Sequence, residues 1–175
     1  MAKYSNSFGQ VTMAVTALNT APATAGLYYL VGGSSAFQTK VSEVYLGGEA
    51  ASASTVAAMA FGRVSNLNSG SPSSPIASVL TDIMSAGSAT TSFPIGYTTW
   101  TTAGPSMAVT GVLLRLSFNA YGGIVRWVSS PDQQITMTGT AVFGTGTQGV
   151  GGQLMLQQTA GTAALMSGHV LFEVM

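Results

Sequence analysis

The feature that most constrains the fold of this chain is an apolar–polar alternation with a period of two. In Val112–Phe118, the apolar residues Leu114, Leu116 and Phe118 alternate with polar ones, and Gln134–Thr140 repeats the pattern. Successive side chains of a β-strand point to opposite faces, so this period predicts strands with one buried and one exposed face.

Further segments rich in β-formers lie between Gly, Pro, Asn and Ser residues. They are Gln10–Leu18, Gly26–Val31, Lys40–Leu46, Thr55–Val64, Ile124–Val128, Leu154–Leu156 and His169–Val174. The spacing predicts a single-domain antiparallel β-sandwich or jelly roll of about eight strands.

Two segments fall outside this set of strands. Residues 1–10 are interpreted as an N-terminal arm that reaches a neighbouring molecule, or else as a frayed end, with the domain over 11–175. The segment Ser74–Met84 predicts the one short helix, because Pro75 suits the first helical position.

Asn119–Gly123 is predicted to form a hairpin connection between the strands that carry Arg115 and Arg126. If these strands pair, the two guanidinium groups lie near each other on the outward face. There they could bind a partner's carboxylates bidentately, or simply be solvated.

Charge is scarce in this chain. Of its 175 residues, 6% are charged, five acidic and five basic, whereas a globular domain has about 25%. Burying Ser, Thr, Asn and Gln costs much less than burying Lys or Glu. The composition therefore favours a surface that packs against copies of itself or a partner, although a weakly charged secreted domain is the alternative.

The same composition argues against several classes of protein. Without a Lys/Arg cluster the chain lacks the electrostatic signature of a nucleic-acid binder. No apolar run reaches the roughly 18 residues of a membrane helix, and the N-terminus lacks the apolar core of a signal peptide. With no cysteine and one histidine, neither a metal site nor a cofactor is expected.

Motifs for catalysis are weak. Gly144–Gly149 fits G-x-G-x-x-G, but a dinucleotide site needs a helix after the glycines, and a strand is expected there. His169 is interpreted as a structural residue on a sheet face, because the acidic residues are scattered and no nucleophile motif is present. A non-enzymatic protein is therefore predicted, without catalytic residues.

Contact residues are selected by their size and position. Arg63 follows a strand and precedes a polar loop, while Tyr97 and Trp100 lie in a loop-rich aromatic stretch. Together with Arg115 and Arg126 they form the predicted interface set. Trp127 is expected in the core, with exposure at an interface as the alternative.

The chain resembles small β-sandwich decoration (cement) proteins of tailed-phage capsids. The residues that carry the resemblance are Phe61–Arg63 before a polar loop, the strand pair Leu113–Leu116 and Ile124–Trp127, and the ending Gly168–Val174. The resemblance implies a homo-oligomer, often a trimer, that sits on the capsid surface and bridges subunits of the major capsid protein or another virion protein.

Three other functions remain open. A coat subunit would share the fold and neutrality but usually needs a basic surface for nucleic acid, and a tail or fibre subunit would share the composition. A carbohydrate-binding module would use Trp100, Tyr97 and Tyr121 as one row of stacking platforms.

Overall fold

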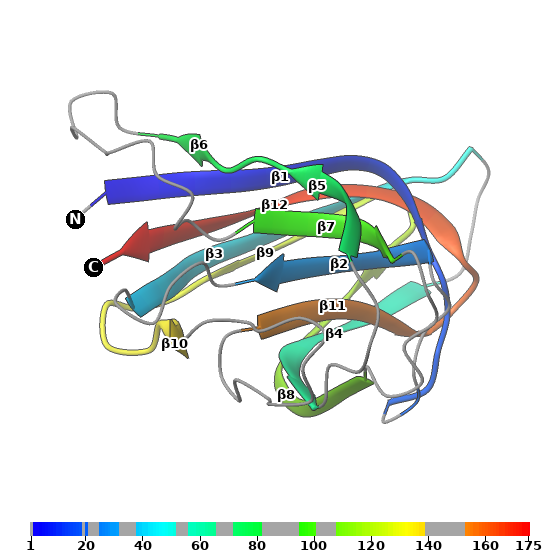
Figure 1. The fold of residues 1–175 in the computed structure, drawn as a ribbon. Helices are drawn as coiled ribbons and strands as arrows, with labels where there is room; N and C mark the ends of the chain where they lie inside the picture. The colour runs from blue at the N-terminus through cyan, green and yellow to red at the C-terminus, as the bar shows by residue number, and fades with distance from the viewer. Residues whose placement is uncertain are drawn as a thin grey trace.

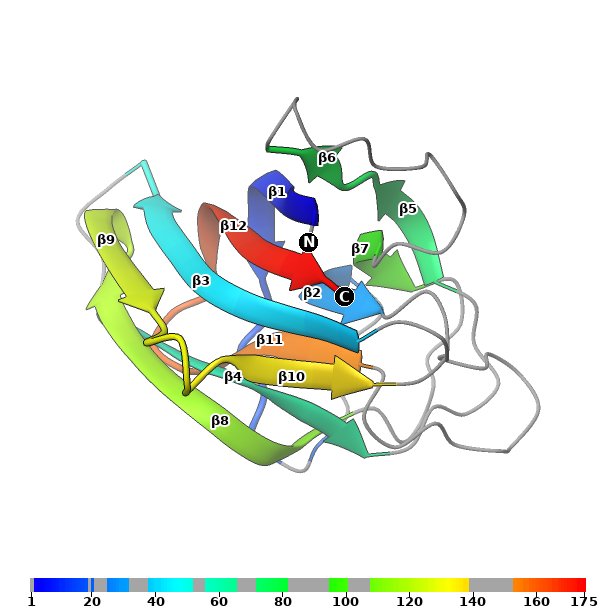
Figure 2. The same ribbon diagram turned by 90° about the vertical axis from the view of Figure 1, so that its left-hand side faces the viewer.

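The computed structural model describes residues 2–18, 20, 25–31, 38–51, 56–65, 72–81, 95–100, 108–138 and 153–175. These residues form twelve β-strands and no helix. The strands make two six-stranded antiparallel sheets that face each other (Figures 1 and 2). The predicted all-β antiparallel sandwich is confirmed, with more strands than the eight expected.

One sheet, called sheet A, contains both ends of the described chain. Five of its strands follow the order β10-β3-β12-β1-β6. The sixth strand, β9, also pairs with β3. Its strands are β1 (Ala2–Met13), β3 (Gln38–Glu49), β6 (Val79–Leu80), β9 (Tyr121–Val128), β10 (Ile135–Thr138) and β12 (Ala164–Val174).

The opposing sheet, called sheet B, has the order β5-β7-β2-β11-β4-β8. Its strands are β2 (Ala25–Val31), β4 (Val56–Ser65), β5 (Pro72–Ile76), β7 (Ile95–Trp100), β8 (Ala108–Asn119) and β11 (Gln153–Ala160). Figure 2 views the two layers from the side on which both termini lie.

The hydrophobic core fills the space between the sheets. Phe172 and Leu46 contribute from sheet A, and Phe61 and Met59 from sheet B, each at most 1% exposed. Burying a side chain of this size contributes about 1.5–3 kcal/mol. Of the residues predicted to face the core on β8 and β10, Phe118, Ile135 and Met137 are buried, and Leu114 and Leu116 are half-buried against the core, which confirms the alternation.

A polar link also crosses the core. Asn6 of β1 is fully buried, and its Oδ1 accepts a 2.7 Å hydrogen bond from the Tyr28 hydroxyl of β2. Its Nδ2 donates to the Ile76 carbonyl at 2.8 Å and to Ser78 Oγ at 3.0 Å. Because buried polar groups are costly without partners, this network fixes the relative position of the two sheets.

The expected N-terminal arm belongs instead to sheet A. β1 begins at Ala2 and pairs with β12 from Ala2 opposite Val174 to Met13 opposite Ala164. Tyr4, Asn6 and Phe8 point inward and are buried. The polar Asn6 at an inward position hid the period of two, so sequence reasoning started this strand eight residues too late.

The helix predicted over Ser74–Met84 is wrong for its described part, which forms β5 and β6. Pro75 is tolerated because β5 is an edge strand, where a missing N–H leaves no partner unsatisfied. The side-chain bonds from Asn6 to Ile76 and Ser78 hold this segment in an extended form.

The predicted hairpin between β8 and β9 is also wrong. β8 pairs with β4 in sheet B, whereas β9 pairs with β3 in sheet A. Ala120, between them, is buried, and its carbonyl accepts the N–H of Ala50 at 3.0 Å. A Cβ on Gly48 would lie 2.2 Å from the Ala120 carbonyl oxygen, so glycine permits this close approach. The connection therefore carries the chain from one sheet to the other.

Candidate functional site

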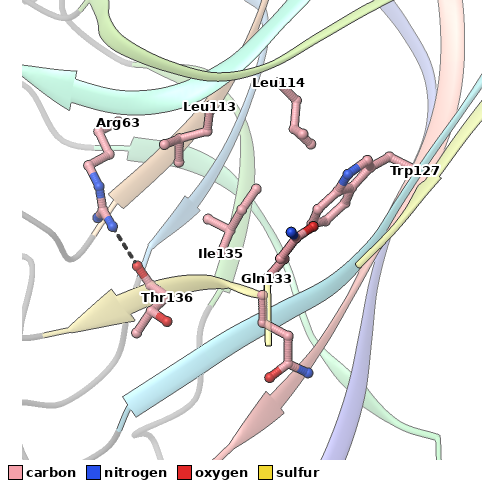
Figure 3. A pocket seen from close by; sticks show the side chains of 8 residues that line it. Arg63, Leu113, Leu114, Trp127, Gln133, Ile135 and Thr136 are labelled. Carbon is pink, nitrogen blue, oxygen red and sulfur yellow. Dashed lines mark hydrogen bonds between the residues drawn. The ribbon is translucent and has the colours of Figure 1, made fainter. Parts of the chain in front are cut away.

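A cleft lies between the sheets at the edge where β8 faces β9 and β10. It has a volume of about 470 Å³, and its lining residues are Arg63, Leu113, Leu114, Trp127, Gln133, Gln134, Ile135 and Thr136. Figure 3 shows Arg63 and Trp127 on opposite sides of this cleft, with Leu113 and Ile135 between them. The volume is in the range of small-ligand sites, about 300–1,000 Å³.

Arg63 links the two sheets across this cleft. It lies on β4 in sheet B, and its Nη2 donates a 2.8 Å hydrogen bond to the Thr136 carbonyl of β10 in sheet A (Figure 3). A bond from a charged donor to a backbone carbonyl is stronger than a neutral one. Arg63, predicted as an interface residue, thus holds β10 against sheet B within this chain.

A cluster of polar side chains occupies the outer face of sheet A. Arg126 of β9 donates from Nε and Nη2 to both carboxylate oxygens of Glu43 on β3, at 2.9 and 2.8 Å. His169 Nε2 of β12 lies 3.1 Å from Glu43 Oε1. The His169 ring stacks on Tyr45, with the ring centroids 5.1 Å apart. The predicted bidentate geometry of Arg126 is present, but the acceptor is in its own chain.

The charge state of Glu43 is set by this cluster. The hydrogen bond from Arg126 lowers the pKa of the Glu43 carboxyl, and the bond with His169 lowers it further, against the opposing effect of desolvation. The same bond raises the pKa of Arg126. Glu43 is therefore an ionised acceptor that ties three neighbouring strands together.

The remaining predicted contact residues do not meet at one site. Arg115 is exposed on β8, in a different sheet from Arg126, so the expected pairing of these two side chains does not occur. Tyr97 and Trp100 lie on β7, whereas Tyr121 is on β9 of the other sheet. The three aromatic residues considered as a row of stacking platforms therefore do not share one sheet.

The outer side of β9 carries an apolar surface. Ile124 and Val128 are 66% and 55% exposed, and Arg126 lies between them with its charge paired to Glu43. These three residues are called the β9 face. No lysine lies on β9, although edge strands in soluble proteins commonly use lysine to prevent pairing with other chains.

Comparisons with known proteins identify no relative: no family model matches this chain, and no curated protein or solved structure is significantly similar to it. Within the described ranges, no helix is long and apolar enough to cross a membrane. The same residues include no group of three or more His, Cys, Asp or Glu side chains that could hold a metal ion. The Gly144–Gly149 motif lies outside the described residues.

Sequence reasoning missed two features of these sites. Glu43 was not connected with Arg126 or His169, because the contact depends on β3 lying between β9 and β12. The glutamine pair Gln133–Gln134 was not selected, because its place beside the cleft depends on β8 of the other sheet and has no signal in the sequence.

Proposed function

We propose that this protein is a non-enzymatic structural component of a virus particle, and that it acts as a capsid decoration protein bridging neighbouring capsid subunits. The β9 face is the observation that carries the assembly part of this proposal. The sequence resemblance to decoration proteins supplies the virion part.

The β9 face has the properties of a contact surface rather than of a solvent-facing strand. Ile124 and Val128 expose apolar area, and the neighbouring guanidinium is neutralised by Glu43. Burying this face would desolvate few unpaired charges, which favours association. Since the whole chain has no net charge, a second copy of it brings no repulsion between net charges.

The second copy is thus the preferred occupant, and a closed oligomer, with a trimer favoured, is the expected form. Symmetric closure would also cover the free edge of β9. Repeated contacts across a shell would then turn modest affinities into tight attachment.

Two valines provide a matched test of the assembly surface. Val128→Lys places a charge in the β9 face, whereas Val56→Lys places one at a site that is 59% exposed at the start of β4. Light scattering is expected to give a monomer for Val128→Lys and the native oligomer for Val56→Lys. Equal masses for the two variants would exclude the β9 face.

Immunogold labelling of purified virus particles tests the virion role separately. An antibody against this protein is expected to label the outer surface of the shell. Label on the tail would favour the tail or fibre alternative, and unlabelled particles that also lack the protein in mass spectrometry would contradict the proposal.

A further inference from the structure

The cleft between β8 and β10 has a shape and a chemistry that the assembly role does not use. Its walls come from both sheets, with Leu113 and Leu114 from sheet B and Trp127 and Ile135 from sheet A. Trp127 packs partly against the core and partly lines the cleft, so its indole ring has a rigid position. A rigid aromatic wall is suited to recognition of a ligand with an apolar face.

The two ends of the cleft limit the length of any ligand. The bond between Arg63 and the Thr136 carbonyl crosses from one sheet to the other at one side, and Trp127 stands at the opposite side (Figure 3). An extended peptide running along the edge of β8 would meet this Arg63 bridge. The open cleft, with a volume of about 470 Å³, therefore suits a small molecule better than an added strand.

The polar groups of the cleft indicate the class of ligand. Gln133 and Gln134 carry amides that can both donate and accept hydrogen bonds, and none of the described residues that line the cleft is a carboxylate or a lysine. A purely apolar ligand would leave amides unpaired, and a phosphate would demand more cationic groups than one bridging arginine. A ligand with hydroxyl groups at its rim and C–H groups on its face satisfies the amides and the indole together.

We propose that this cleft binds a neutral saccharide of one or two units, with Trp127 as the stacking surface and the amides of Gln133 and Gln134 bonding to hydroxyl groups. Arg63 is a positioning residue, because it holds β10 in place. This site is independent of the assembly role and differs from the row of Tyr97, Trp100 and Tyr121.

Tryptophan fluorescence offers a direct test. The chain has two tryptophans, so Trp100→Phe leaves Trp127 as the only indole. This variant would be titrated with glucose, galactose, mannose, N-acetylglucosamine and their common disaccharides, with calorimetry as a second readout. We expect a saturable change in Trp127 emission for at least one of these sugars.

Variants in the same single-tryptophan protein locate the site. Gln133→Ala and Gln134→Ala are each expected to weaken the sugar affinity about fivefold or more, as loss of a hydrogen bond of about 1 kcal/mol implies. Gln38→Ala removes an amide outside the cleft and should leave the affinity unchanged. No saturable response to any sugar in either readout, or equal affinities in all three variants, would overturn the proposal.

Discussion

The two sheets of this protein differ in where charged residues lie. The strands of sheet B contain only Arg63 and Arg115, and none of them contains a carboxylate. The strands of sheet A contain Lys3, Lys40, Glu43, Glu49, Arg126 and Glu173. The few charges of the strands are therefore concentrated in one of the two sheets.

Burial explains this difference. Along β12 of sheet A, buried and half-buried residues alternate. Along β11 of sheet B, Leu154–Gln158 are buried in succession, including Met155 and Gln157, which point away from the core between the sheets. A strand covered on both faces, as β11 is, has no solvated face for charges.

The contacts of Gln157 show which part of the chain covers the outer face of β11. Its Nε2 donates to the carbonyls of Thr16 and Ala17, both at 3.0 Å, so the chain that leaves β1 lies over this part of sheet B. The low charge of this part of sheet B is therefore explained by contacts within the chain. It follows that an assembly surface is better sought on sheet A, where the β9 face is open.

The largest expected effect tests whether the outer side of sheet B is more deeply buried than the outer side of sheet A. Met155→Ala should destabilise the protein by about 2–5 kcal/mol, because it opens a cavity on the outer side of sheet B. Leu171→Ala removes a similar side chain from the outer side of sheet A, where it is only half-buried. Guanidinium unfolding should show a clearly smaller loss for Leu171→Ala, and equal losses would break the comparison.

The link between the sheets should have the next largest effect. Tyr28→Phe removes the donor to Asn6 Oδ1 in a fully buried site and should cost about 1–3 kcal/mol. Tyr121→Phe is the matched control, since Tyr121 is 54% exposed and its change should stay within about 0.5 kcal/mol. Urea unfolding of both variants measures the change in the free energy of unfolding. An unchanged stability of Tyr28→Phe would show that the bond between Tyr28 and Asn6 does not stabilise the protein.

Acid should act on sheet A through Glu43. Its pKa in the folded protein lies below the ordinary value of 4.5, so its stabilisation is complete above that pH and is lost as the pH falls through the lowered pKa. The groups facing it are Arg126 and His169. Unfolding at pH 7 and at pH 3 should show Glu43→Gln to be less stable than wild type at pH 7 and less sensitive to acid. The same acid sensitivity in both proteins would contradict this role.

The smallest effect is expected at the exposed charge of sheet B. Arg115→Gln should change the free energy of unfolding by less than about 0.5 kcal/mol, because Arg115 is exposed and no strand of its sheet carries a carboxylate. Thermal unfolding measures this. A decrease of more than about 1 kcal/mol in the free energy of unfolding would show that the charge of Arg115 stabilises sheet B.

The same difference between the sheets explains how much the sequence could predict. The period of two was recognised on the inner face of β8 and on β10, where the expected inward residues Phe118, Ile135 and Met137 are buried. The edge strand β5 lacks this alternation, since it consists of Pro, Ser and a single Ile. Asn6 also broke the pattern, because its role depends on Tyr28 from the other sheet.

The functional sites were less predictable than the fold. Arg63 and Arg126 were predicted as interface residues, and the contacts that the structure gives them, with Thr136 and Glu43, lie in the same chain. Which strands are neighbours cannot be read from local periodicity, and the β8–β9 connection was misassigned for this reason. The cleft at Trp127 arises from two sheets and has no local signature.

The mass of the native protein in solution is the most direct test of the central claim that this β-sandwich acts by assembly. Light scattering over a concentration series is expected to give a constant mass that is a multiple of 17.7 kDa, with three copies favoured. A constant mass of 17.7 kDa up to high micromolar concentration would contradict the claim, and the β9 face would then be an ordinary exposed surface.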